Sequence, residues 1–362
     1  MANIHTEFFD HFKYDKKGKY SWNIVSVSKD EENKRSVFCA TNKEDKNDIL
    51  YVKQFKISFE LNEKFDNAQI LKEIYFLVLL RNQNYIVQLE DILFDDNENF
   101  KRVFLIFRGN CVSLNKLINF SGDYLSNKEL IKWIIYQITF GLYILHNNNI
   151  IHNDIKPSNI LINEVGGITI CDFGSAAYKN EDSNTYTKYY ASPEFLNDLK
   201  IKRNEKSDMW ALGVIIIELH LKINGYFKSN NEDNSNINQL KFILSKYGIN
   251  ENIQPEEIKN IIANSSDSKI IKLNKEEIEK INDKDAIDLI QNLLSLNPEK
   301  RFNAEQVLNS KYLDLPNIKD IDSQNIVKIE EQKVYFQLYE LIDKKKFYEI
   351  ILELINILNK SK

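Results

Sequence analysis

The stretch "IIHNDIKPSNILI", residues 150–162, holds side chains whose types and order suit one kind of chemistry. Asp154 and Asn159 supply oxygen atoms, and Lys156 lies between them with a compact positive charge. Asp172 follows in "CDFGS" and adds a second carboxylate. Hard oxygen ligands suit Mg²⁺, and a carboxylate beside a lysine can aim a hydroxyl group at a phosphoryl group. Together these residue types predict phosphoryl transfer.

Length and composition define the scaffold that must hold these side chains. The chain has 362 residues, of which 43% are hydrophobic and 12% aromatic, enough for a large core. This size suits one large bilobal domain or two ordinary ones. Proteins that bind nucleic acids usually carry an excess of positive charge, whereas this chain has a net charge of −5. We therefore expect no nucleic-acid partner.

The sequence also bears on location. No apolar run approaches the ~18 residues that indicate a membrane span, and the charged N-terminal stretch lacks the apolar core of a signal peptide. We therefore expect no membrane partner and a cytoplasmic protein, with a nuclear location left open. Cys39, Cys111 and Cys171 are few, odd in number and far apart, which indicates reduced thiols on small buried side chains.

Residues 20–107 have the pattern of a strand-rich region. Short apolar runs such as "SVFCAT", "ILYVKQF" and "RVFLIF" alternate with polar loops, as in antiparallel strands. The stretch 67–82 instead places Ile70, Ile74 and Leu77 at helical spacing. The first third of the chain therefore predicts antiparallel strands with one helix.

From Asn110 onward the periodicity is helical. Residues 126–148 open with Ser126 and Glu129, which predict a capping box, and continue with apolar residues along one face. Residues 207–222 are apolar nearly all round, as expected of a helix buried inside a second lobe.

The residues beyond Leu315 form a separate segment. Their pattern predicts one or two amphipathic helices. An apolar stripe of this kind usually packs on a core, so we expect the segment to pack on the second lobe. The alternative is a docking tail on which a regulatory protein binds.

Over about residues 20–313, these motifs together resemble the eukaryotic protein kinase family. The resemblance implies an α+β, bilobal protein-kinase-like fold, with a small antiparallel-sheet N-lobe that holds one helix and a larger helical C-lobe. It divides the chain into an N-terminal extension at 1–19, a kinase-like domain at 20–314 (N-lobe 20–108, C-lobe 109–314) and a C-terminal helical extension at 315–362.

The resemblance also implies a role for each chemical group. "HNDIKPSN" matches the family's catalytic loop, so Asp154 would accept the proton of a protein substrate's hydroxyl and Lys156 would neutralise the transferring phosphate. Asn159 and Asp172 would hold Mg²⁺. The implied cofactors are ATP and Mg²⁺, and the residues that the family pattern places around the nucleotide are Lys53 with its partner Glu73, Val37, Tyr51, Phe107 and Leu161.

Features of the second lobe narrow the substrate class. The motifs "YASPE" and "SDMW" resemble those of protein kinases, and the resemblance implies an ion pair between Arg301 and Glu194. Small-molecule kinases of the aminoglycoside and choline type lack this set. Lys156 and Thr187 are typical of serine/threonine enzymes. The segment before "SPE" is weakly similar to the cyclin-dependent and MAP kinase group, although Ala191 replaces that group's arginine.

The sequence departs from the family at several positions. Asn153 replaces an arginine that binds a phosphate on the activation segment, so control by phosphorylation should be looser while catalysis remains. Tyr51 replaces the small alanine that packs on adenine, and Arg108 replaces the hinge glutamate. The three glycines that let backbone N–H groups approach phosphates are replaced by Asp30, Glu32 and Arg35.

These observations leave alternatives open. A serine/threonine protein kinase that transfers the ATP γ-phosphate to protein Ser/Thr hydroxyls uses every chemical group named above. A pseudokinase, acting as a binding scaffold or allosteric partner, explains the altered glycine loop and Tyr51. A small-molecule kinase is a third hypothesis. Nucleotide affinity distinguishes the first two, and the identity of the phosphate acceptor distinguishes the third.

Overall fold

The computed structural model divides into two compact units. Unit 1 comprises Met1–Gln83, Val87–Cys111 and Lys328–Lys362, and unit 2 comprises Asn84–Ile86 and Val112–Val327. The residues that the structure describes are 22–29, 35–42, 45, 47–57, 64–94, 102–109, 111–120, 124–181, 186–202, 204–228, 235–250, 255–264, 271–314 and 344–360.

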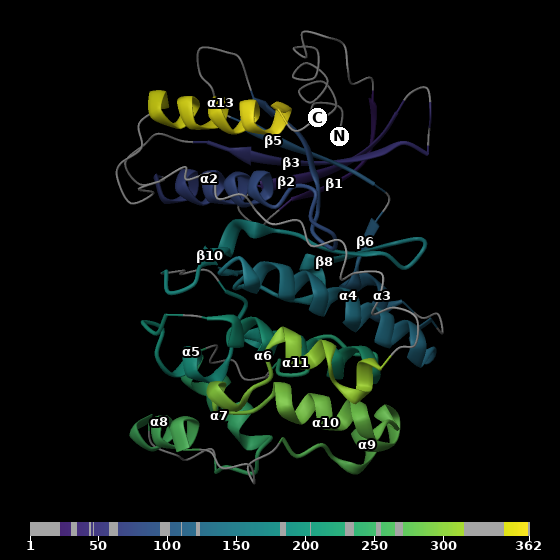
Figure 1. The fold of residues 1–362 in the computed structure, drawn as a ribbon, viewed down its shortest axis with the longest axis vertical. Helices are drawn as coiled ribbons and strands as arrows, with labels where there is room; N and C mark the ends of the chain where they lie inside the picture. Colours follow the sequence, from purple (N-terminus) through teal and green to yellow (C-terminus); the bar gives the residue numbers. More distant parts are fainter. Residues whose placement is uncertain are drawn as a thin grey trace. The chain divides into compact units, whose positions relative to one another are not determined.

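A five-stranded antiparallel sheet forms the centre of unit 1 (Figure 1). Its strands are β1 Trp22–Lys29, β2 Arg35–Asn42, β3 Ile49–Lys56, β4 Leu89–Phe94 and β5 Arg102–Arg108. They lie in the order β1-β2-β3-β5-β4, and each pairs antiparallel with its neighbours. The strands predicted for the first third of the chain are therefore confirmed.

The two faces of this sheet differ in burial. One face carries a closed hydrophobic cluster of Phe38, Ala40, Leu50, Val52, Phe104 and Ile106. Val37, Tyr51 and Lys53 alternate with these residues along β2 and β3, and none of the three is fully buried. Because successive side chains of a strand point to opposite faces, these three share the other face, which we call the open face.

Helix α2, Lys64–Leu79, is the helix predicted for the first third and is confirmed. The predicted stripe of Ile70, Ile74 and Leu77 is buried. Phe76 and other apolar residues off this stripe are buried as well. A helix that is buried nearly all round needs a cover on the side that does not face the sheet.

Helix α13, Lys344–Lys360, supplies a cover of this kind, because it contacts α2 and β4 (yellow in Figure 1). The prediction that the C-terminal segment packs on the second lobe is therefore wrong for α13. The apolar stripe of α13 is buried within unit 1. This burial favours a packing role for the stripe over the docking of a regulatory protein. The stripe consists of Ile350, Ile351, Leu354 and Leu358. The expected helix within 315–343 lies outside the described residues.

Unit 2 is largely helical (Figure 1). Its α-helices are α3 Leu114–Asn119, α4 Lys128–Asn147, α5 Pro193–Asn197, α6 Glu205–Leu221, α7 Asn236–Ser245, α8 Pro255–Asn264, α9 Lys275–Ile281, α10 Lys284–Leu293 and α11 Ala304–Leu308. Short 3₁₀ turns are η1 Tyr124–Ser126, η2 Pro157–Asn159, η3 Phe173–Ser175, η4 Lys188–Tyr190, η5 Pro298–Lys300 and η6 Lys311–Leu313. None of the described helices has the length and apolar character that a bilayer crossing requires.

Two helices of unit 2 test the sequence predictions directly. Every residue of α6 from Asp208 to Leu221 is buried, so the predicted central helix is confirmed. Helix α4 is also confirmed, but its predicted cap is wrong. The side chain of Asn127, not Ser126, accepts hydrogen bonds from the N–H groups of Glu129 and Leu130, because Asn127 directly precedes the first helical residue.

Short strands position the loops that carry the candidate chemistry. These strands are β6 Cys111–Ser113, β7 Ile150–Ile151, β8 Ile160–Asn163, β9 Ile168–Ile170 and β10 Ala177–Tyr178. β7 pairs with β10, and β8 pairs with β9, in both cases antiparallel. The loop between β7 and β8 and the loop between β9 and β10 are therefore held at their ends by backbone hydrogen bonds.

Candidate active site

The loop after β7 is anchored by the buried carboxylate of Asp208 on α6. The backbone N–H groups of His152 and Asn153 each donate to this carboxylate at 2.9 Å, and His146 Nε2 lies 3.0 Å from it. Burial by itself would raise the pKa of Asp208. Hydrogen bonding and charge from His146, together with His152, outweigh burial and hold the pKa below its usual value. The loop therefore starts from an ionised anchor.

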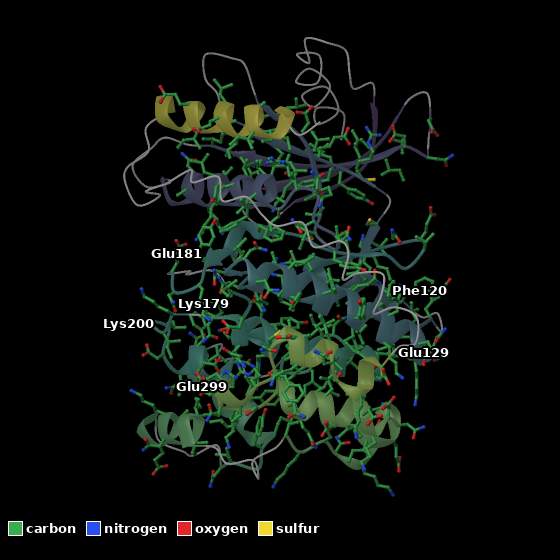
Figure 2. All side chains as sticks on the ribbon, in the orientation of Figure 1. Phe120, Glu129, Lys179, Glu181, Lys200 and Glu299 are labelled. Atoms are coloured by element: carbon green, nitrogen blue, oxygen red, sulfur yellow. The ribbon has the colours of Figure 1, made fainter. Side chains whose placement is uncertain are left out.

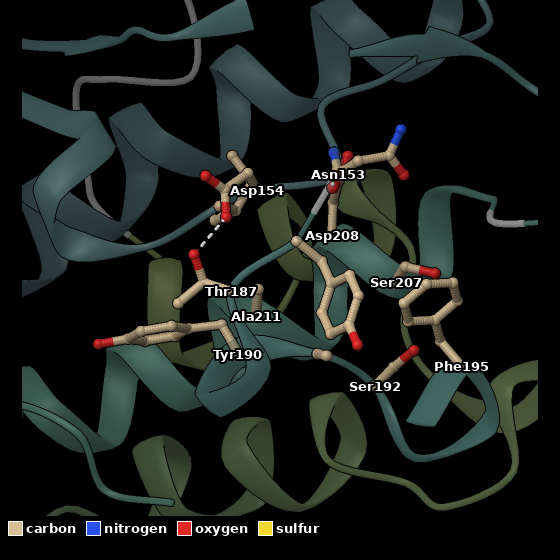
Figure 3. Close-up of a pocket in the computed structure, with 12 residues that line it drawn as sticks. Asn153, Asp154, Thr187, Tyr190, Ser192, Phe195, Ser207, Asp208 and Ala211 are labelled. Atoms are coloured by element: carbon tan, nitrogen blue, oxygen red, sulfur yellow. Dashed lines mark hydrogen bonds between the residues drawn. The ribbon is translucent and has the colours of Figure 1, made fainter. Parts of the chain in front are cut away.

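Asp154, Lys156 and Thr187 form a triangle of short hydrogen bonds. Lys156 Nζ donates to Asp154 Oδ2 at 2.7 Å, and the Thr187 hydroxyl donates to Asp154 Oδ1 at 2.6 Å (Figure 3). Lys156 Nζ also donates to Thr187 Oγ1 at 2.7 Å. Both oxygens of the Asp154 carboxylate are therefore held in place, one by a cation and one by a hydroxyl.

A pocket on unit 2 opens beside this triangle (Figure 3). Asp154 and Thr187 line it together with Tyr186, Tyr190 and Phe195. The Asp154 side chain retains 12% exposure. The carboxylate therefore lies in the wall of the pocket and is partly exposed.

Asn159 and Asp172 are brought near each other by the backbone of Cys171. The Cys171 N–H donates to the Asn159 carbonyl at 2.9 Å, and the Cys171 carbonyl lies 3.1 Å from His152 Nε2. Asn159 Nδ2 donates to Asp154, at 2.9 Å to the carbonyl and 3.1 Å to Oδ2. The residue before Asp172 is thus tied to two points of the catalytic loop.

The donor chemistry of these two residues fits Mg²⁺. The amide nitrogen of Asn159 faces Asp154, so its amide oxygen is the atom that would meet a cation, and Asp172 offers a carboxylate. Mg²⁺ usually takes one or two carboxylates and completes its shell with phosphates and water. In the part of the chain that the structure describes, no cluster of three or more His, Cys, Asp and Glu side chains forms a metal site made of protein alone.

Asn153 links the catalytic loop to the segment after Asp172. Its Nδ2 donates to the carbonyls of Ser175 at 3.1 Å and Ile151 at 3.3 Å, and the residue is buried. Its backbone φ is +69°, a conformation that asparagine adopts more readily than most residues. This link is neutral and needs no phosphate.

Further contacts hold the described parts of the segment after Asp172 on unit 2. Lys179 pairs with Glu205 on α6 at 2.9 Å, and Figure 2 shows Lys179 and Glu181 along one flank of the unit. The Tyr186 hydroxyl lies 3.0 Å from Asn236 Oδ1 at the start of α7. Residues 182–185 lie outside the described residues.

The buried carboxylate of Glu218 holds the end of this segment. It accepts hydrogen bonds from the Tyr190 hydroxyl at 3.0 Å and from the N–H groups of Gly225 at 2.8 Å and Tyr226 at 2.9 Å. Burial raises the pKa of Glu218 to about 7, although these donors act in the opposite direction.

The implied ion pair between Arg301 and Glu194 is present. Arg301 donates to both oxygens of Glu194, at 2.9 and 3.0 Å, and also to the carbonyls of Ser295 and Lys206. Its guanidinium lies 5.1 Å from the Trp210 ring centroid, and its side chain has no exposed surface. The buried charge is thus fully paired.

On unit 1, the predicted pair of Lys53 and Glu73 is formed. Lys53 Nζ on β3 donates to Glu73 Oε1 on α2 at 2.6 Å. Glu73 is nearly fully buried, whereas the Lys53 side chain keeps 15% exposure. Lys53 therefore has a fixed position on the open face and is still accessible to a phosphate.

Tyr51 and Arg108 behave differently from each other. The Tyr51 hydroxyl donates to the backbone carbonyl of Cys111 at 2.9 Å, so the ring stays on unit 1. Arg108 forms a bidentate pair with Glu90, at 2.7 and 2.9 Å, and also pairs with Asp48. These hydrogen bonds raise its pKa above the usual value. Arg108 alternates with Phe107 along β5 and so points away from the open face.

The other predicted nucleotide residues divide between the units. Val37 is 37% exposed and pairs in register with Lys53, and Phe107 pairs in register with Tyr51, so both lie on the open face. Leu161 lies on β8 of unit 2 and is half-buried. Of the residues aligned with the family's glycines, Asp30 and Glu32 lie outside the described residues. The backbone of Arg35 is described as the first residue of β2.

Sequence reasoning missed several contacts. Nothing in the sequence signals a backbone carbonyl such as that of Cys111 as a partner for Tyr51. Glu218 did have a signal, since it is a lone acidic residue within the apolar run "VIIIELH". Cys39, Cys111 and Cys171 are thiols outside any disulfide, as predicted, but they are half-buried rather than fully buried.

A sheet unit with a Lys–Glu pair and a helical unit with an anchored Asp–Lys–Thr triangle define a protein kinase domain. The family described as "Protein kinase domain" matches residues 34–313, so the chain belongs to that family. The predicted resemblance and fold class are confirmed.

The similar proteins include several mitogen-activated protein kinases. The chain is 30% identical over 251 residues to mitogen-activated protein kinase hog1 of Trichoderma harzianum. This alignment covers 67% of this chain and 66% of that protein. It is also 30% identical over 251 residues to the HOG1 kinase of Exserohilum turcicum, with 71% of that protein covered. The alignment thus spans about two thirds of these relatives. The solved MAP kinase LmaMPK10 from Leishmania major matches over 100% of both chains with a TM-score of 0.70 and 18% identity, which supports the fold.

Proposed function

We propose that the protein is a serine/threonine protein kinase that transfers the γ-phosphate of ATP to hydroxyl groups of protein Ser and Thr residues. The observation that carries this proposal is the triangle of Asp154, Lys156 and Thr187 beside an open pocket. The MAP kinases among the similar proteins support protein substrates over small molecules.

In this proposal Asp154 is the catalytic base. A base must lie within hydrogen-bond reach of the proton that it accepts, and Asp154 lines the pocket through which a hydroxyl can enter. The hydroxyl of Thr187 and the ammonium of Lys156 keep the carboxylate from rotating. Lys156 also carries a positive charge 2.7 Å from the base, where it would stabilise negative charge on the transferring phosphoryl group.

The remaining groups serve the nucleotide and its metal. Asn159 and Asp172 would hold Mg²⁺, which when bound neutralises charge on the β- and γ-phosphates. Lys53, fixed by Glu73, would pair with phosphate oxygens. Since Asn153 ties the loop to the Ser175 carbonyl without a phosphate, we propose that activity does not require phosphorylation of the activation segment.

The test combines binding and transfer on the full chain. Mg²⁺-ATP binding is read as a thermal shift, and transfer is read with radiolabelled ATP and a generic basic protein as acceptor. Asp172→Asn should abolish transfer, whereas Asp285→Asn, a matched change at an exposed position of α10, should leave it intact. Absence of both shift and transfer in the wild type would refute the proposal and favour a pseudokinase that acts by binding a partner.

A further inference from the structure

Tyr51 occupies a central place on the open face of unit 1. In register it lies opposite Cys39 on β2 and Phe107 on β5, so the three side chains form one row across the sheet. Lys53 follows two positions later on the same face. A planar ligand on this face would have to cover the row, directly beside the lysine that would hold its phosphates.

The Tyr51 ring is also tied in place. Its hydroxyl donates to the Cys111 carbonyl, which lies 60 residues away in sequence, at 2.9 Å. Burial, with the Cys39 thiol beside it, raises the pKa of Tyr51 to about 12. The hydroxyl therefore remains protonated at neutral pH and keeps its donor role.

Lys53 and Tyr51 thus give opposite indications for a nucleotide. The lysine is paired, accessible and suited to phosphates, whereas beside it on the same face lies an aromatic ring that a hydrogen bond holds in place. This face therefore offers a partner for the phosphates, and a phenol ring where the base would have to lie.

We propose that Tyr51 is a plug: its ring fills the place that a purine base would take on the open face, and its hydrogen bond to Cys111 holds it there. Nucleotide binds when this bond breaks and the ring swings out. The inference rests on the proposed function, since it concerns access of nucleotide to the same site.

The plug has a quantitative consequence. The apparent dissociation constant equals the intrinsic constant divided by the fraction of molecules whose site is open. A smaller side chain at position 51 should raise that fraction to one. Removal of the hydroxyl alone should weaken the closed form by the contribution of one hydrogen bond and leave the ring free to move.

The experiment measures binding of a fluorescent ADP analogue with Mg²⁺ to the full chain. Tyr51→Ala should bind at least about tenfold more tightly than the wild type, as expected if about a tenth of the molecules are open. Tyr51→Phe should bind up to about fivefold more tightly, the ratio that one neutral hydrogen bond supports. Tyr124→Ala, which removes a tyrosine that is 60% exposed on unit 2, should leave the affinity unchanged.

Association kinetics provide a readout that a purely structural role of Tyr51 would not move. If the ring must open first, the observed rate for the wild type should level off at high nucleotide concentration. The rate for Tyr51→Ala should rise linearly. If circular dichroism shows that the alanine variant is unfolded, Tyr51→Val replaces it, because valine is favoured in strands and is still far smaller than tyrosine.

The outcomes separate the plug from the proposed function. Tighter binding by Tyr51→Ala without Asp172-dependent transfer supports the plug and refutes the kinase activity. Equal or weaker binding by Tyr51→Ala, with transfer intact in the wild type, refutes the plug alone. Absence of nucleotide binding in both proteins refutes both.

Discussion

Each unit carries one half of the predicted site residues, and the two halves are held in place differently. On unit 2, Asp154 has both oxygens held by short hydrogen bonds, and its loop is anchored on the buried Asp208. On unit 1, the pair of Lys53 and Glu73 is in place, but Tyr51 lies beside Lys53 on the same face and is tied to the Cys111 carbonyl. The half that we propose to perform chemistry is complete, whereas the half that we propose to receive the base is altered.

This difference separates two properties of the protein. Groups that act on the phosphoryl group must keep their geometry, since any change in them affects the reaction itself. Groups around the base act on affinity, which can change while the chemical step is retained. We therefore expect changes on unit 2 to alter turnover and changes at Tyr51 to alter nucleotide affinity.

The strongest test of this separation is Asp154→Asn. The amide keeps the size of the side chain but cannot accept the hydroxyl proton, so kcat should fall by about 10²–10⁴-fold while nucleotide affinity stays unchanged. Steady-state kinetics and direct nucleotide titration check both quantities. A normal kcat in this variant would contradict the role of Asp154, and a parallel loss of affinity would contradict the separation of the two halves.

A second test concerns the frame that holds the complete half. Arg301→Met leaves Glu194 without its cation, so the free energy of unfolding should fall by about 3–5 kcal/mol. The control is Lys280→Met, which breaks the pair with Glu276 at 2.8 Å on the surface and should change stability little. Urea denaturation measures both. Equal effects of the two changes would show that the buried pair contributes no more than an exposed one.

A third test concerns the frame of the altered half. Leu354→Ala removes a buried side chain from α13, where it packs within unit 1, and should lower stability by about 3 kcal/mol. Leu352→Ala is a matched control on the same helix, because Leu352 is 37% exposed, and it should lower stability by less than about 1 kcal/mol. Hydrogen exchange of α2 amides should increase only in Leu354→Ala. An unchanged α2 in that variant would mean that α13 does not hold it.

The smallest expected effect depends on pH. The pKa of Glu218 rises from 4.5 to about 7 on folding, so its contribution to stability is present below pH 4.5 and is lost as pH rises to about 7. Glu218→Gln has no carboxyl group that ionises, so its stability does not fall over this pH range. At pH 8 its free energy of unfolding should exceed that of the wild type by at most roughly 3 kcal/mol, since one pKa unit corresponds to about 1.4 kcal/mol.

Another buried group titrates with the opposite sign in an overlapping range. Burial lowers the pKa of His220 from 6.5 to about 4, so its contribution is lost as pH falls through that range. Thermal denaturation should therefore compare Glu218→Gln with the wild type at each pH, where His220 contributes equally to both. A stability difference that does not grow from pH 5 to 8 would contradict the raised pKa of Glu218.

Much of the fold and site could be predicted because the signals are local. Alternating apolar residues predicted the strands of unit 1, helical spacing predicted α2, and an all-apolar run predicted the buried α6. The chemical groups Asp154, Lys156 and Asn159 lie in one short loop, so their proximity followed from the sequence alone. The capping error at α4 arose because Ser126 and Asn127 are both good caps, and only the observed start of the helix distinguishes them.

The sequence by itself determined which chemical groups the protein has, in which order, and on which kinds of elements. The tertiary structure decided which distant groups meet. Tyr51 reaches the Cys111 carbonyl, Asn153 reaches the Ser175 carbonyl, and α13 covers α2. Every residue has a backbone carbonyl, so a partner of this kind has no signature in the sequence. Likewise, an apolar stripe predicts that a helix packs against another element. It does not predict which element that is, because burial of apolar surface is non-directional.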